Sequence, residues 1–75
     1  MLYKNNNGLT YEVIARGCDK NGVPCALLKS KGGRWVCAWS WYMDRGEWGQ
    51  GHYFMENEEG AREFFKENYF FGGVR

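Results

Sequence analysis

Long apolar runs, close cysteine pairs and a strong net charge are all missing from this sequence, and each absence argues against a class of protein. No stretch approaches the ~20 apolar residues that a membrane-spanning helix needs, and residues 1–5 contain no apolar core of a signal peptide. Three cysteines, an odd number, do not predict a disulfide framework. We therefore expect a cytoplasmic protein with reduced thiols and no membrane association.

The cysteines, the single histidine and the carboxylates do not form a recognisable chemical site. Cys18, Cys25 and Cys37 include no C-x-x-C pair, the spacing that structural zinc sites usually provide. Cys37 and His52 fall on neighbouring predicted strands, but no third group is identifiable that would orient the histidine for catalysis. Several carboxylates fit the first turn and solvent face of a helix: Glu56, Glu58, Glu59, Glu63 and Glu67. The sequence predicts no metal, no cofactor and no enzymatic activity.

Small size and low net charge restrict the function further. A chain of 75 residues makes one small domain, residues 1–75, which buries only about 60% of its unfolded surface. Large side chains build a core from few residues, and the aromatic content of 19% meets that need. The net charge of +1 disfavours a strongly basic nucleic-acid-binding protein.

Residues 34–43 carry the strongest structural signal. Trp35, Trp39 and Trp41 share one parity with Cys37 and Met43, which is the period of a strand with one apolar face. The other predicted strands are residues 10–16, residues 24–30, a strand from residue 48 after a turn at 44–47, and a candidate fifth strand at 2–4 within the segment 1–9.

After Met55 the period changes to that of a helix. Asn57 is a good N-cap, and the residues that follow place an apolar stripe on one face: Ala61, Phe64, Phe65 and Tyr69. The helix should end near Tyr69 and leave residues 70–75 as a tail. The sequence thus predicts an α+β fold, a four- or five-stranded antiparallel β-meander with one C-terminal helix packed on one face.

The predicted turn at Gly32-Gly33 sets the register of the sheet. A two-residue loop there places Leu28 opposite Cys37, and the next turn places Cys37 opposite Phe54. One face then holds Ala26, Leu28, Cys37, Trp39, Trp41, Met43, Trp48 and Phe54. The other face holds Leu27, Val36, Ala38, Ser40, Tyr42, Gly49, Gly51, Tyr53 and Met55.

Neither face is polar, and a single helix can cover only one of them. We expect the helix to cover the tryptophan face, which is the more apolar. The other face would stay open as a groove with a floor of glycine, alanine and serine and with tyrosine walls, a candidate contact site. The proposed anchors for a protein partner are Tyr42, Arg45, Trp48 and Tyr53, and a homodimer is the simplest assembly.

A nucleic-acid-binding role is the alternative hypothesis. Lys29, Lys31 and Arg34 surround the predicted hairpin turn, and a nearby tyrosine could stack on a base. The patch is small and the acidic helix opposes it, so protein binding remains the preferred interpretation.

The run Gly46-Glu47-Trp48-Gly49-Gln50-Gly51-His52-Tyr53-Phe54, with the tryptophan strand before it and a helix after it, resembles small proteins of phages and mobile elements of Gram-positive gut bacteria. No functional residue carries over. The resemblance implies a bacterial host cell, where short non-enzymatic proteins, anti-CRISPR proteins among them, often block host defences. On this basis the expected activity is inhibition of a host defence nuclease by stoichiometric binding to a larger bacterial protein.

Overall fold

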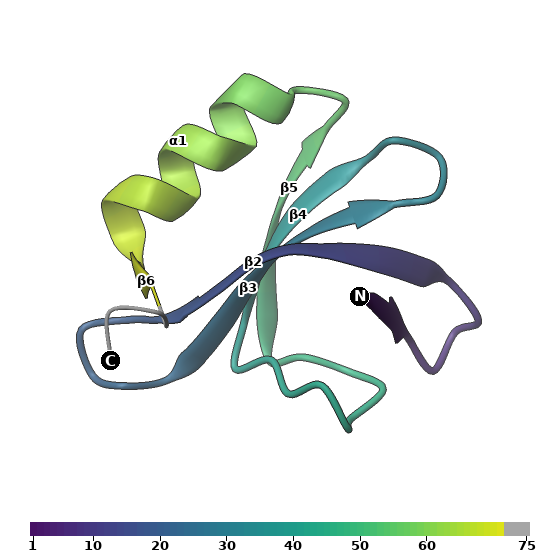
Figure 1. Cartoon of the computed structure of the whole chain (residues 1–75), viewed down its shortest axis with the longest axis horizontal. Helices are drawn as coiled ribbons and strands as arrows, with labels where there is room; N and C mark the ends of the chain where they lie inside the picture. Colours follow the sequence, from purple (N-terminus) through teal and green to yellow (C-terminus); the bar gives the residue numbers. More distant parts are fainter. Residues whose placement is uncertain (72–75) are drawn as a thin grey trace.

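Short turns connect strands that pair with their neighbours in sequence, so the sheet is an antiparallel meander with one helix packed on it (Figure 1). The computed structural model describes residues 1–71. Its elements are β1 (Leu2–Lys4), β2 (Thr10–Cys18), β3 (Pro24–Ser30), β4 (Trp35–Trp39), β5 (Gln50–Met55), α1 (Glu58–Asn68) and β6 (Phe70–Phe71). The α+β class and the five-stranded alternative are confirmed, because β1 to β5 pair in sequence order.

The asparagine-rich segment after β1 is an ordered turn. The side chain of Asn5 accepts a hydrogen bond from the backbone N–H of Asn7, and the side chain of Asn7 accepts one from Leu9. Gly8 has φ of 92°, a conformation that glycine adopts without a steric cost. In the turn the backbone N–H groups have no strand partner, and these side-chain bonds satisfy two of them. The turn allows β1 to fold back on β2.

One edge of β2 pairs with two different strands. Its first residues pair with β1, and Gly17 and Cys18 pair with β6. A register shift between Val13 and Ala15 marks a bulge, which bends the strand. Phe70 and Phe71, which the sequence analysis assigned to the tail, therefore form a short strand, and residues 72–75 lie outside the described part of the chain.

The turn between β3 and β4 corrects the predicted register. The N–H of Ser30 donates to the carbonyl of Arg34, so three residues rather than two form the loop, and Gly33 has φ of 88°. Leu27, not Leu28, therefore pairs with Cys37. A shift of one residue moves every β3 side chain to the opposite face, which is why Ala26 and Leu28 were assigned to the wrong side.

β4 ends four residues earlier than predicted. Ser40 has φ of 61°, and this left-handed conformation breaks the alternation of the strand. Trp39 packs on the helix side of the sheet, whereas Trp41 packs on the other side. β5 consequently begins at Gln50 rather than at residue 48, and Cys37 pairs with His52 rather than with Phe54.

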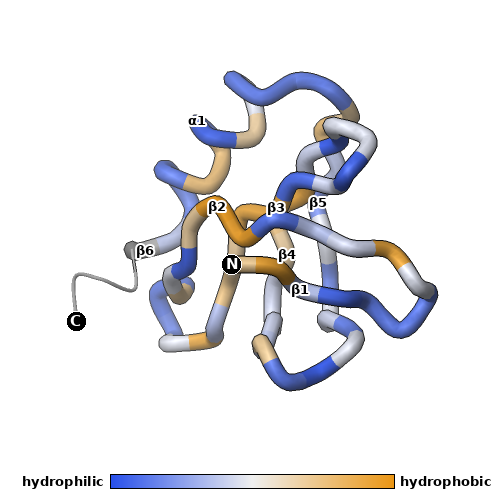
Figure 2. The backbone as a smooth tube through the Cα atoms, turned by 45° about the vertical axis from the view of Figure 1, so that its right-hand side comes forward, coloured by the Kyte–Doolittle hydropathy of each residue, from blue (hydrophilic) through white to orange (hydrophobic). Residues whose placement is uncertain are grey.

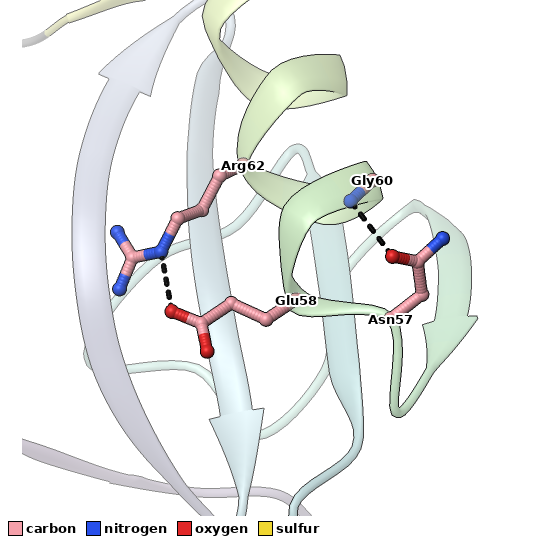
Figure 3. Close-up of polar contacts among 4 residues, drawn as sticks. All are labelled: Asn57, Glu58, Gly60 and Arg62. Atoms are coloured by element: carbon pink, nitrogen blue, oxygen red, sulfur yellow. Dashed lines mark hydrogen bonds and ion pairs between the residues drawn. The ribbon is translucent and has the colours of Figure 1, made fainter.

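The helix begins and ends where the sequence predicts. The side chain of Asn57 caps α1 by accepting a hydrogen bond of 2.9 Å from the N–H of Gly60, and Arg62 forms an ion pair of 2.8 Å with Glu58 (Figure 3). Gly60 leaves room for this cap, because a Cβ atom there would lie 2.9 Å from the Asn57 Cγ. Tyr69 closes the helix by donating its N–H to the carbonyl of Phe65.

Each face of the sheet has its own core. The helix-side core contains Cys25, Leu27, Trp35, Cys37, Ala61, Phe65 and Tyr69. The opposite core, here called the aromatic core, contains Tyr3, Tyr11, Ala26, Leu28, Val36, Ala38 and Trp41, with Trp48 packed against it. Figure 2 shows apolar stretches along β2 and β3, and apolar residues that alternate with polar ones in the helix.

The expectation of an open second face was wrong. The rings of Tyr3 and Trp41 lie 5.2 Å apart in an edge-to-face arrangement, and those of Tyr11 and Trp48 lie 5.5 Å apart. The N–H of Asn6 donates to the carbonyl of Gly46 at 2.7 Å, which ties the β1–β2 turn to the β4–β5 connection. β1 and this connection thus cover the face that the helix leaves free (Figure 1).

A carboxylate that the sequence analysis did not single out forms several hydrogen bonds at the end of the sheet that carries the β2–β3 turn. Asp19, in the β2–β3 turn, accepts a hydrogen bond of 2.8 Å from the indole N–H of Trp39 and others from the N–H groups of Asn21 and Val23. The Trp39 bond is the largest cause that lowers the pKa of Asp19 below its usual 3.8, and the Val23 bond adds to it.

We expect Asn57→Ala to lower the free energy of unfolding by ~1 kcal/mol, because it removes the cap of α1. Gly60→Ala alone should raise the free energy of unfolding little, since its methyl group would displace the Asn57 side chain that caps the helix. In the Asn57→Ala background the same change should raise the free energy of unfolding by up to ~1 kcal/mol, because alanine has the higher helix propensity. Urea unfolding of the four proteins measures this coupling, and simple additivity would contradict the role given to Gly60.

Asp19 should make the fold sensitive to acid. Because its folded-state pKa is lowered, its contribution to stability is fully present above pH 3.8 and is lost as the pH falls through the folded-state pKa. Asp19→Asn should therefore reduce the loss of stability on acidification. The check is the difference in urea midpoint between about pH 7 and about pH 3; an equal difference in both proteins would exclude this role.

Candidate functional site

The closure of the aromatic core leaves a groove of about 840 Å³ at the end of the sheet that carries the β3–β4 turn. Its walls come from the β1–β2 turn, from the β3–β4 turn and from the end of β5. Tyr11 and Val36, which are 8% and 2% exposed, lie at its base and belong to the aromatic core. The groove is therefore an exposed extension of that core.

Three exposed apolar side chains line the groove. Leu9 is 51% exposed, Tyr53 is 65% exposed and Met55 is 59% exposed. Leu9 comes from the turn before β2, whereas Tyr53 and Met55 come from β5, so the chain folds to bring them to one site. Single exposed apolar residues are common on proteins, but a group that lines one groove is typical of a contact surface.

The backbone of Met55 is held in an unfavourable conformation. Its φ is 55°, in the left-handed region, and a register shift between β4 and β5 occurs at the neighbouring Trp35–Met55 pair. A residue other than glycine or asparagine in this region costs of order 1 kcal/mol. The Met55 backbone keeps this unfavourable conformation although its side chain is exposed beside the groove.

Two cations and one carboxylate surround the apolar side chains. Lys31 and Arg34 are exposed in the β3–β4 turn, and Glu56 follows β5. The turn itself is braced, because the N–H of Arg34 donates to the Ser30 hydroxyl at 3.0 Å. Among residues 1–71 the structure forms an ion pair between Glu58 and Arg62. Neither Lys31 nor Arg34 has a carboxylate partner among these residues. The groove thus has a small excess of positive charge on its turn side.

The structure divides the three cations proposed for nucleic-acid binding. Lys31 and Arg34 line the groove together with Tyr53. Lys29 instead extends on the helix side, where its ammonium lies 5.6 Å from the centre of the Trp35 ring. Arg62 of α1 contacts the same ring at 5.2 Å. Lys29 is therefore engaged in packing rather than placed at the groove wall.

The four proposed protein-binding residues are also divided. Tyr53 lies in the groove, whereas Trp48 is half-buried in the aromatic core. The guanidinium of Arg45 lies 4.4 Å from the centre of the Tyr42 ring within the β4–β5 connection. Tyr42 lines a separate pocket of about 650 Å³, formed with Arg16 and other residues. Tyr53 is thus the one of the four that meets the hairpin cations.

Sequence reasoning missed Leu9 as a site residue and placed Met55 on a sheet face without a role. A signal for Leu9 was present, because it is an apolar residue between Gly8 and Thr10 in an otherwise polar turn. No local signal identifies Met55, because its exposure depends on the register shift at the end of β5.

Two of the three thiols, those of Cys25 and Cys37, are unsuited to nucleophilic chemistry. Burial raises the pKa of Cys25 to about 12, with the Asp19 charge adding to it, and burial raises the pKa of Cys37 to about 12. The Cys37 thiol donates to the carbonyl of Ala61 at 3.5 Å, whereas His52 is exposed and packs against Phe64. An activated cysteine has the opposite property, a lowered pKa in an accessible position.

Within residues 1–71, no three or more His, Cys, Asp and Glu side chains are grouped so that they could hold a metal ion. The same part of the chain contains no helix with the length and apolar character needed to cross a membrane. Comparisons with protein-family models, curated proteins and solved structures found no match to this chain. The functional argument therefore depends on the groove.

We expect one thiol to react quickly with Ellman's reagent in the native protein. Cys18 is half-buried, whereas Cys25 and Cys37 are 1% and 0% exposed. All three thiols should react after unfolding in guanidinium. A Cys18→Ser variant should lose the fast phase, and rapid reaction of a second native thiol would contradict the burial described above.

Proposed function

We propose that this chain is a non-enzymatic protein that binds a larger protein partner through the groove. The observation that carries this proposal is the convergence of Leu9, Tyr53 and Met55, three exposed apolar side chains from separate segments, on one groove. Tyrosine and methionine are among the residue types enriched in protein interfaces. The buried, high-pKa thiols support a role in binding over one in nucleophilic catalysis.

The resemblance of residues 46–54 to phage and mobile-element proteins supports the choice of partner. In that setting the chain acts in the cytoplasm of a bacterial host cell and inhibits a defence nuclease, in the manner of an anti-CRISPR protein, by stoichiometric binding. A small domain suits such a role, because inhibition by occlusion needs affinity and shape rather than catalytic groups.

A second candidate is a nucleic-acid-binding accessory role. It is favoured by one observation, the position of Tyr53 beside Lys31 and Arg34, which is an arrangement that could stack a base and hold a phosphate. Only two cations line the groove and Glu56 opposes them, so we place this function second.

A homodimer is part of the proposal. Among the described residues β5 pairs only with β4, so its other edge is available to a second strand. Pairing of two such edges about a two-fold axis would join the two sheets into one.

Photo-crosslinking tests the main proposal. Benzoylphenylalanine placed at Tyr53 should capture one protein from host-cell extract, whereas the same probe at Lys20, in the β2–β3 turn at the opposite end of the strands, should not. Capture should persist after nuclease treatment and at about 0.5 M salt, because apolar contacts resist screening. A Met55→Ala change should reduce capture at position 53.

Light scattering of the purified protein tests the homodimer, because it measures whether the mass in solution is that of one chain or of two.

Equal capture at the two positions would contradict the assignment of the groove. Loss of capture after nuclease treatment, together with binding of a single-stranded oligonucleotide that weakens steeply with salt, would replace the proposal with the second candidate.

A further inference from the structure

We propose that the groove binds an extended peptide segment of the partner, in which a large apolar side chain is flanked by an acidic residue. This inference rests on the proposed function, and it names the part of the partner that is recognised. It follows from the shape of the groove, from its apolar walls and from the position of its charges.

The shape favours a slender occupant. A groove of about 840 Å³ is the size of a small-ligand pocket, which takes a few residues of extended chain but no folded domain. Its base is formed by Tyr11 and Val36, behind walls that rise from three separate segments. In a two-fold dimer centred on this groove each copy would bring an identical hollow, and two hollows cannot fill each other.

The apolar walls call for an apolar anchor. Tyr53 and Met55 on β5 line the groove together with Leu9, and all three are more than half exposed. Methionine adapts its shape to different partners, and tyrosine combines a large apolar face with a polar tip. An aromatic or leucine side chain between them would cover surface that water contacts in the free protein.

The charges determine the flanking residue. Lys31 and Arg34 lie on the turn side of the groove without an ion-pair partner among residues 1–71. Arginine binds carboxylates through paired hydrogen bonds, so an acidic side chain fits here. Glu56 occupies the β5 side and disfavours a second acid there. The peptide should therefore carry its acid toward the β3–β4 turn and none beside Glu56.

The backbone of Met55 links the groove to the stability of the fold. Its left-handed conformation lies in the turn that the N–H of Asn57 closes on the carbonyl of Phe54 at 2.9 Å, and the Met55 side chain is exposed at the groove. Glycine at this position would relieve the conformation and remove the contact. Met55→Gly should thus raise the thermal midpoint and weaken peptide binding, a combination that a purely structural role for Met55 does not produce.

The experiment is a selection of random octapeptides displayed on phage against the immobilised protein, with counter-selection against the Tyr53→Ala variant. The selected peptides should share an aromatic or leucine residue next to Asp or Glu. Fluorescence polarisation of one selected peptide then gives its Kd. Arg34→Glu and Tyr53→Ala should each weaken it about tenfold, whereas Lys20→Glu, the same charge change at the far end, should leave it unchanged.

A charge exchange makes the test stricter. The selected peptide with Lys in place of its acid should bind poorly to the natural protein and regain affinity for the Arg34→Glu variant. No excess of acidic residues among the selected peptides, or no loss of affinity in Arg34→Glu, would overturn the inference. Binding of oligothymidylate that competes with the peptide library would overturn it in favour of a nucleic acid.

The outcome separates this inference from the proposed function. If crosslinking at position 53 captures a host protein but the selection shows no acidic preference, the protein-binding role stands and the peptide chemistry is wrong. If neither yields a binder dependent on Tyr53, both are wrong.

Discussion

The structure depends on covering a sheet that is apolar on both faces. One helix of 11 residues covers one face, and the chain covers the other with its own aromatic rings. The left-handed backbone of Ser40 makes this possible, because it places Trp39 and Trp41 on opposite sides of the sheet. A regular strand would have left both tryptophans on the helix side and the second face without Trp41.

The groove is a consequence of this closure. β1 and the β4–β5 connection cover the middle of the second face but not the end at the β3–β4 turn, where the core residues Tyr11 and Val36 lie at the base of a hollow. Around that hollow the chain keeps apolar side chains exposed and two cations unpaired with described residues, while burial raises the pKa of the Cys25 and Cys37 thiols. Exposed apolar side chains grouped in this way are typical of a surface that a binding partner covers.

The local elements were predictable where a short stretch of sequence decides them. Asn57 and the apolar stripe after it determine the helix, and Pro24 begins its strand as predicted. The register was not predictable, because Gly32-Gly33 fits a two-residue or a three-residue loop and only Gly33 takes a positive φ. That single residue reversed the predicted faces of Ala26 and Leu28.

By itself the sequence determined the class of the fold, the helix and most of the strands, because periodicity and capping act between residues close in the chain. Only the tertiary structure decided which residues form the site. Leu9, Lys31 and Tyr53 come from three segments, and they meet because of the bend of β2, the length of one loop and the fold-back of β1. Such meetings depend on packing between distant parts of the chain, which no local pattern records.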